Sequence, residues 1–156
     1  MIKFFNLIFI FFSISLSSLE QEYSSSQNKF SLLVHKTPAC GCCKKWVNHL
    51  EANSFSTMIR DHQSLQKIKE QYAIKPKYQS CHTAVSKDGY FFEGHIPSKF
   101  IKQFLANPEA DAIGLSVPGM PLGSPGMEVE GSFMPYDVLV LYKDGSSKVY
   151  AEVRKL

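Results

Sequence analysis

The feature that most constrains the fold is a cluster of three cysteines between an apolar run and a helical pattern. Cys40, Cys42 and Cys43 follow the short apolar stretch 30–36 and begin a helical pattern that ends near Asn53. An apolar run of this length is typical of a buried central strand. The strand therefore leads into a helix through the cysteines, which places thiols at a helix N-terminus. There the helix dipole and the free backbone N–H groups favour thiolate over thiol, so the cluster indicates redox or metal chemistry.

The remaining pattern predicts an α/β fold with a thioredoxin-like core. Periodicity and chain breakers place strands at 55–59, 82–86 and 90–96, a helix capped by Asp61 that stops before Pro76, and a helix from Pro97 to Asn107. The order is βαβ, a further helix, and then ββα. A βαβ unit requires parallel strands, and the ββα unit adds an antiparallel hairpin with a covering helix. This is the order of the thioredoxin fold, which carries its chemistry at the first strand-to-helix turn.

Residues 107–132 have a different composition from the rest of the chain. They contain four of the eight prolines and five of the nine glycines, and a terminal hairpin is expected after them, at 133–142 and 148–153. A loop of this length in a compact domain is usually functional or disordered. We expect its part from Val117 to Met127 to form a lid over the cysteines.

Four of the five methionines fall in this segment or in strand patterns. Met120 and Met127 lie in proline- and glycine-containing turns rather than at helical core spacing. Thioethers are good Cu(I) ligands, so both are candidate metal ligands; the alternative is that they are apolar plugs that pack the loop. Met58 and Met134 fall in strand patterns and are expected in the core.

The N-terminus has the pattern of a secretory signal peptide. Lys3 is followed by an almost wholly apolar run from Phe4 to Leu16 and then by small residues suited to cleavage. The run is shorter than the roughly 20 apolar residues that a membrane span needs, so we expect no stable membrane anchor. The predicted organisation is a signal peptide at 1–18, a flexible mature N-terminus at 19–29 and a single domain at 30–156.

Charge and cysteine count exclude some classes of function. The chain carries 17 basic and 14 acidic side chains, which are scattered, so nucleic acid is not expected as a partner. Four cysteines in an exported protein are often two structural disulfides. Here Cys42 and Cys43 are adjacent, and any pair within the cluster closes only a very small loop, which stabilises little. Structural disulfides remain the less favoured alternative.

The spacing Cys40-x-x-Cys43 matches the redox dithiol of thioredoxin-like proteins. Two details depart from that pattern. Cys42 adds a third thiol, and Cys81-His82 stands before the third strand where a thioredoxin places its cis-proline. Four thiols and at least one imidazole at one place suit soft ions such as Cu(I), or Zn(II), with sulfurs that bridge several ions. His82 is a candidate ligand beside Cys81. His95, which leads into the last helix, is a candidate ligand or a structural histidine.

Four strings of the sequence resemble successive motifs of the DUF411 family of exported thioredoxin-like proteins, some of which are CopG-like and associated with copper resistance. The strings are TPACGCCKKWVNHLE, SCHTAV, EGHIPSKFI and GLSVPGMPLGSPGMEV. They cover roughly residues 31–142, and their combination is highly specific. The resemblance implies a periplasmic protein that binds copper through Cys40, Cys42, Cys43 and Cys81, with a multinuclear thiolate cluster and redox activity as further expectations.

The hypothesis from the sequence is therefore a periplasmic copper-binding protein that contributes to copper tolerance. Its expected partners are copper ions and other periplasmic copper-handling proteins. One alternative is a thiol–disulfide oxidoreductase that uses Cys40 to attack and Cys43 to resolve. A second alternative is a binding module stabilised by zinc.

Overall fold

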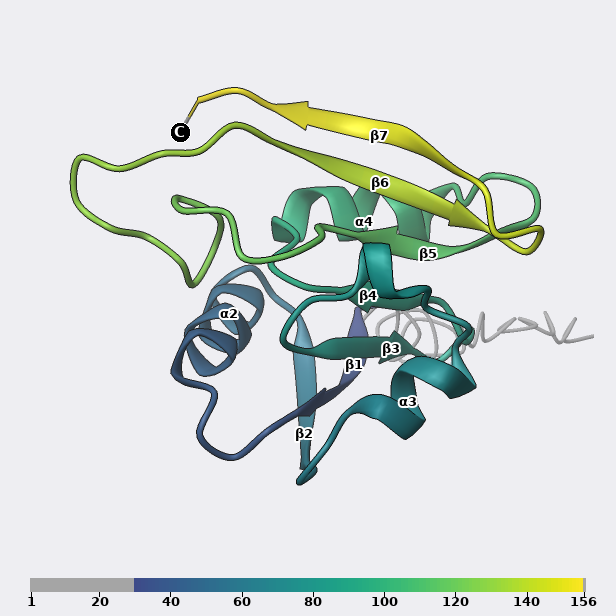
Figure 1. Ribbon diagram of the computed structural model, residues 1–156, viewed down its shortest axis with the longest axis horizontal. Coiled ribbons are helices and arrows are strands. Elements are labelled where there is room, and N and C mark those ends of the chain that lie inside the picture. Colours follow the sequence, from purple (N-terminus) through teal and green to yellow (C-terminus); the bar gives the residue numbers. More distant parts are fainter. Residues whose placement is uncertain (1–29, 156) are drawn as a thin grey trace, which may run out of the picture.

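The structure, a computed structural model, describes residues 30–155. The predicted signal peptide and the predicted flexible N-terminus at 19–29 lie outside the described residues. The elements in chain order are β1 (Ser31–Lys36), α2 (Gly41–Ala52), β2 (Ser56–Asp61), α3 (Gln66–Gln71), a 3-10 turn (Pro76–Tyr78), β3 (Thr83–Ser86), β4 (Phe91–Glu93), α4 (Ser98–Ala106), β5 (Ala112–Ser116), β6 (Tyr136–Tyr142) and β7 (Ser147–Val153) (Figure 1). Among the described residues, no helix is long and apolar enough to cross a membrane.

Within residues 30–155, seven strands form one sheet in the order β2-β1-β3-β4-β5-β6-β7. β1 is parallel to β2 and antiparallel to β3, and β3 is antiparallel to β4. With α2 between β1 and β2, and α4 after β4, these four strands have the thioredoxin topology. The predicted fold class is confirmed.

β5 corrects the prediction that 107–132 is entirely loop. Ala112–Ser116 forms a strand that pairs in parallel with β4 and antiparallel with β6. The sheet thereby continues past β4 to the predicted terminal hairpin, in which β6 and β7 are antiparallel. A five-residue strand containing a glycine has a weak local signal, and its partners are distant in sequence, so the surrounding sheet decides its conformation.

Helices cover both faces of the sheet. Buried side chains of α2 and α4 pack with Leu32, Val34, Ala84 and Phe92 into the larger core, on one face. On the other face, the smaller core contains Ile74 and Tyr78, which follow α3, together with Phe91 and Leu141. Neighbouring residues of β4 and β6 point to different cores because side chains alternate along a strand.

Two boundaries differ from the sequence prediction for local reasons. Asp61 belongs to β2 and pairs with Lys36 at 2.8 Å, so it does not cap the next helix, which begins at Gln66. β4 ends at Glu93 because Gly94 has φ +81°, a left-handed conformation that turns the chain away from the strand.

The prediction that two methionines lie in the core is also wrong. Met58 is 66% exposed and Met134 is 52% exposed. β2 is an edge strand with mostly exposed residues, and Met134 lies just before β6 rather than within it. Strand periodicity alone does not distinguish an edge strand from a central one.

Candidate metal centre

The cysteine turn lies between β1 and α2, as expected. Cys40 is the N-cap of α2, and its Sγ accepts a hydrogen bond from the backbone N–H of Cys43 at 3.3 Å. The two residues are joined by a disulfide, with their Cα atoms 5.3 Å apart. Cys43 is fully buried, whereas Cys40 is partly exposed. The helix N-terminus thus presents the pair of cysteines whose spacing matches a redox dithiol.

Cys81 brings the fourth sulfur to this turn from the segment before β3. Cys42 and Cys81 are free thiols. The Sγ of Cys42 lies 3.5 Å from that of Cys40 and 4.0 Å from that of Cys81. The Sγ of Cys81 lies 3.4 Å from that of Cys43. All four sulfurs are within 4.8 Å of one another, so the predicted convergence of the four cysteines is present.

Two histidines adjoin the sulfurs at Cys81. The Nδ1 of His82 lies 3.3 Å from the Sγ of Cys81, and the Nε2 of His95 lies 3.1 Å from it. These three ligand atoms form a second group within 4.8 Å. Both imidazoles are fully buried. The His82 ring packs against Trp46 with centroids 4.3 Å apart, and its Nε2 has no hydrogen-bond partner.

The backbone assigns the tautomer of His95. Its Nδ1 lies 2.8 Å from the carbonyl oxygen of Pro125, which can only accept, so Nδ1 carries the proton. Burial lowers the pKa of His95, and burial followed by the charge of His95 lowers the pKa of His82 well below 6.5. In neutral His95 the Nε2 lone pair therefore points at the Sγ of Cys81. This is the orientation that a metal ligand requires.

The thiol of Cys81 is held in its protonated form. Burial raises the pKa of Cys81 to about 12, and the neighbouring Cys42 acts in the same direction. The Cys81 S–H can then donate to the Nε2 of His95. The site therefore keeps a proton at the position that a soft cation would take, and binding of such a cation would release it.

The segment from Val117 to Met127 lies against the cysteine turn, beside α2 in Figure 1. Gly126 is so close to α2 that an added Cβ would lie 2.7 Å from the backbone oxygen of Cys42. At its other end the segment is fastened to the Cys81 loop, because the N–H of Gly119 donates to the oxygen of Gln79 at 3.2 Å. The predicted lid position is confirmed. Three of the four cysteines nevertheless remain partly exposed, so the lid does not seal the cluster.

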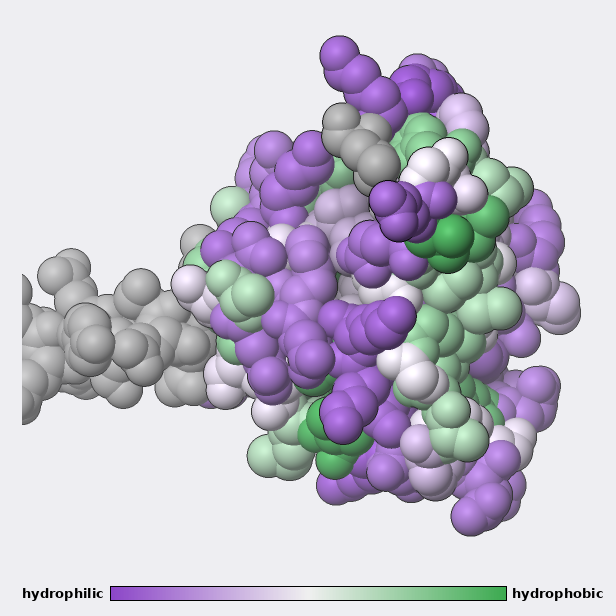
Figure 2. Space-filling view, turned by 90° about the vertical axis from the view of Figure 1, so that its left-hand side faces the viewer, coloured by the Kyte–Doolittle hydropathy of each residue, from purple (hydrophilic) through white to green (hydrophobic). Residues whose placement is uncertain are grey.

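The two candidate methionine ligands occupy different surroundings within this lid. Met120 is 51% exposed and lines a surface hollow of about 430 Å³ together with Pro118, Pro121 and Met134. Met127 is half-buried, and its backbone N–H donates to the oxygen of Ser124 at 2.8 Å. Figure 2 shows this end of the molecule, where apolar side chains gather in a band beside a larger hydrophilic area.

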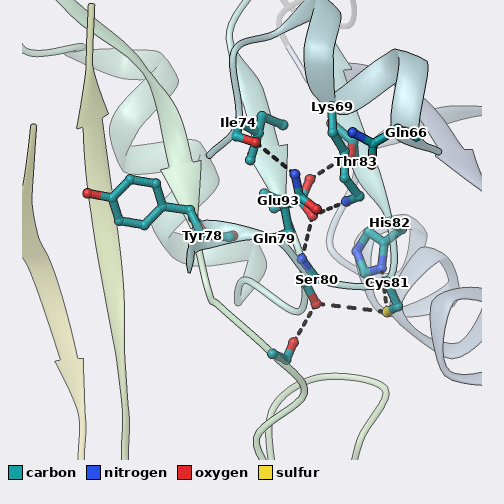
Figure 3. Close-up of polar contacts among 12 residues, drawn as sticks. Gln66, Lys69, Ile74, Tyr78, Gln79, Ser80, Cys81, His82, Thr83 and Glu93 are labelled. Carbon is teal, nitrogen blue, oxygen red and sulfur yellow. Dashed lines mark hydrogen bonds and ion pairs between the residues drawn. The ribbon is translucent and has the colours of Figure 1, made fainter. Parts of the chain in front are cut away.

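Sequence reasoning missed a buried network of polar side chains that adjoins the residues on either side of Cys81-His82. Glu93 at the end of β4 is fully buried and forms an ion pair with the buried Lys69 of α3 (Figure 3). A signal for the lysine was present: Lys69 lies four residues after Leu65, on the apolar face of the predicted helix. Glu93 correspondingly stands in an apolar strand pattern. A lysine on the apolar face of a helix and a glutamate in an apolar strand are both expected to be buried. Because charged residues are rarely buried unless they are paired, the two together indicate an ion pair.

Comparisons with known proteins identify relatives of this chain. The family model of DUF411, described as a protein of unknown function, matches residues 78–127. The solved structure of copper resistance protein CopG, form 1, is 39% identical with a TM-score of 0.75 and covers 81% of this chain and 98% of its own. The form 2 structure is 40% identical with a TM-score of 0.75 and covers 80% and 98%. A comparison with curated proteins found no match.

Fold and site together define a thioredoxin-like protein whose dithiol turn is part of a larger cysteine and histidine cluster. The donor set of thiols and imidazoles suits soft and borderline metal ions. Because two solved structures that share 39% and 40% of their residues with it match about four fifths of its length, the chain belongs to the DUF411 family, together with the copper resistance protein CopG.

Proposed function

We propose that this protein binds copper through Cys40, Cys42, Cys43 and Cys81, with His95 and His82 as nitrogen donors, and that it contributes to copper tolerance. The observation that carries the proposal is the position of Cys81. Its Sγ belongs both to the group of four sulfurs and to the group with two imidazoles. Thiolate and imidazole are the ligands that Cu(I) prefers, and the names of the CopG relatives support copper over other soft ions.

Full use of the four sulfurs requires reduction of the Cys40–Cys43 disulfide. An external thiol reductant must supply two electrons and two protons to convert the disulfide into two thiols, and the reductant is itself oxidised to a disulfide; the two cysteine thiols then exchange their protons for Cu(I). The oxidised and reduced forms of this pair should therefore bind different amounts of copper. Because copper binding would depend on the redox state of the Cys40–Cys43 pair, we propose a redox-active site rather than one that only stores copper.

We further propose that the bound copper is multinuclear. Cys42 and Cys43 are neighbours in the chain, and all four sulfurs lie within 4.8 Å of one another, so thiolates that bridge two ions are favoured over one tetrahedral site. Cys42 is the thiol that a simple dithiol enzyme would not need. Met120 and Met127 are proposed as additional thioether ligands when the lid lies on the copper-loaded site.

The proposed location is the periplasm. The leader pattern at 1–18 would direct export, and a thiol cluster that handles copper at the cell envelope agrees with a role in copper tolerance. Fractionation of cells that express the full chain, followed by mass measurement of the mature protein, tests this. Protein that stays in the cytoplasmic fraction with residues 1–18 retained would contradict it.

The decisive experiment is copper stoichiometry in anaerobic, reduced protein. Wild type loaded with Cu(I) and freed of excess metal should contain more than one copper per chain by elemental analysis, and Cys42→Ser should contain fewer. The same protein loaded without reductant is the matched control and should also bind less. One copper per chain that is unchanged in Cys42→Ser would refute the multinuclear site. Zinc retained in preference to copper would support the zinc-stabilised module instead.

A second candidate function is thiol–disulfide exchange. It is favoured by the Cys40–Cys43 disulfide at a helix N-terminus, with the Sγ of Cys81 3.4 Å from that of Cys43. The rest of the cluster opposes it, because exchange between Cys40 and Cys43 needs neither the thiols of Cys42 and Cys81 nor the two imidazoles beside them. We therefore rank this function below copper binding.

A further inference from the structure

Glu93 has more contacts than an ion pair requires. Its carboxylate is fully buried, and Lys69 from α3 donates to Oε1. Taking two charges out of water is costly, and a buried pair by itself is weak evidence for a contribution to stability. The other contacts of the carboxylate therefore indicate its role.

Those contacts lie on either side of Cys81-His82. The backbone N–H of Ser80 donates to Oε1 at 2.6 Å, and the hydroxyl of Thr83 donates to Oε2 at 2.6 Å (Figure 3). One carboxylate thus holds the residue before the pair and the residue after it. Gly94, the residue after Glu93, adds a backbone hydrogen bond: its N–H donates to the oxygen of His82 at 3.1 Å. The three hydrogen-bond partners of the carboxylate are all donors. Burial raises the pKa of Glu93, and the charge of Lys69 and these hydrogen bonds oppose that rise.

Other bonds of the segment before β3 fall on residues 78–80: the oxygen of Tyr78 accepts from the hydroxyl of Ser116, and Gln79 and Ser80 bond to the backbone of Gly119. No proline stands between Pro76 and β3, and no cis peptide bond occurs among the described residues, so no ring restricts this backbone. A segment of this kind opens easily unless its backbone groups are bonded. Yet it carries the Sγ of Cys81 to 3.4 Å from that of Cys43 and to 3.1 Å from the Nε2 of His95.

We infer that Glu93 is a positioning residue that holds Cys81 and His82 against the cysteine turn, with Lys69 as its charge partner. Glu93 itself touches none of the candidate ligand atoms. It acts through Ser80 and Thr83, and Lys69 balances the carboxylate that would otherwise be buried alone. The inference deepens the proposed copper site and rests on it only for the copper measurement below.

The test is local hydrogen exchange in the metal-free protein. Glu93→Gln keeps the shape of the side chain but replaces one acceptor oxygen with a donor, which then faces Lys69 or Thr83. We expect exchange at 80–83 to become about tenfold faster, the factor for loss of one hydrogen bond to a charged group. Exchange at the buried residues of β6, an inner strand of the sheet, reports global unfolding and serves as the internal reference. The exposed Glu152→Gln is the matched control and should leave 80–83 unchanged.

A double variant separates positioning from simple destabilisation. Glu93→Gln leaves Lys69 buried without its partner, so Lys69→Met is added to remove that charge. We expect the double variant to regain most of the thermal stability while 80–83 still exchanges fast and Cu(I) binds less tightly than in wild type. The positioning role is refuted if exchange at 80–83 returns to the wild-type rate together with stability. It is also refuted if Glu93→Gln accelerates exchange in β6 as much as at 80–83.

The exchange measurement is independent of copper. Faster exchange at 80–83 in a protein whose wild type binds no copper would uphold the positioning role and refute the proposed function. If the wild type binds copper and Glu93→Gln leaves exchange at 80–83 unchanged, the proposed function is upheld and the positioning role is refuted.

Discussion

His95 donates its Nδ1 proton to the carbonyl oxygen of Pro125 at 2.8 Å, so a residue of the lid sets the tautomer of a histidine beside the cysteines. The opposite nitrogen of the ring lies 3.1 Å from the Sγ of Cys81. The connection between β5 and β6 therefore acts on the site in two ways: Pro125 bonds to His95, and Gly126 lies against α2. A change in the lid should be measurable at the metal centre.

Gly126→Ala should displace the lid. The added Cβ would lie 2.7 Å from the oxygen of Cys42 and 2.8 Å from the nitrogen of Trp46, at φ +87°. Gly131→Ala is the matched control, because Gly131 also has positive φ, +68°, but open space around it. We expect the control to lose about 1–2 kcal/mol of unfolding free energy from backbone strain alone. Gly126→Ala should lose a further 1–3 kcal/mol or so from overpacking.

Cu(I) transfer to a chelator measures the functional effect of that displacement. Gly126→Ala should release copper faster than wild type because Pro125 no longer holds His95, and Gly131→Ala should release it at the wild-type rate. Equal release rates in the two variants would show that the lid does not act on the site.

The methionines of the lid should contribute to copper retention through their sulfurs. Replacing Met120 and Met127 with leucine keeps the apolar bulk, so stability should change by less than about 1.5 kcal/mol. We expect weaker Cu(I) binding and faster exchange in competition with a chromophoric chelator. Met134→Leu is the control, since Met134 is similarly exposed and lines the same hollow as Met120. Wild-type affinity in the double variant would mean that the methionines only pack.

General disulfide reductase activity should be weak. Cys81-His82 occupies the place where a thioredoxin seats its substrate peptide, and Cys81 lies 3.4 Å from Cys43. In an insulin reduction assay with dithiothreitol we expect a rate far below that of thioredoxin under the same conditions. A thioredoxin-like rate that is lost in Cys40→Ser and unaffected by a copper chelator would reverse the ranking of the two functions.

His35 should make the metal-free protein less stable in acid. Its ring is buried and lies 2.8 Å from the His62 ring, nitrogen to nitrogen. Burial first, and then the charges of His62 and Arg60, lower the pKa of His35 from its ordinary 6.5. The folded state therefore takes up this proton less readily than the unfolded state does. The contribution of neutral His35 to the free energy of unfolding is complete above about pH 6.5. It is lost as the pH falls toward the lowered pKa of the folded state.

Urea unfolding at about pH 7.5 and about pH 5.5 measures this effect. The loss of unfolding free energy between the two should be smaller in His35→Gln than in wild type. It should not vanish, because burial also lowers the pKa values of His49 and of the two histidines at the site. An identical loss in the variant and in wild type would contradict the role of His35.

The sequence by itself determined the parts of this protein that depend on local order. The apolar run 30–36, the thiols that follow it and the helical spacing after them define a strand, a cysteine turn and a helix. Breakers such as Asp88-Gly89 and Pro97 separate the later elements. Because a βαβ unit and a following hairpin admit few arrangements, the thioredoxin core and the meeting of Cys81 with the cysteine turn followed from that order.

The tertiary structure alone decided what depends on distant partners. Ala112–Ser116 is a strand only because β4 and β6 lie on either side of it. Lys69 of α3 and Glu93 of β4 are buried as an ion pair, and neither charge would stay buried without the other. The carbonyl of Pro125 reaches His95 only when the lid crosses α2. The ion pair joins residues 24 positions apart and the His95–Pro125 bond joins residues 30 positions apart, where no local propensity or spacing applies.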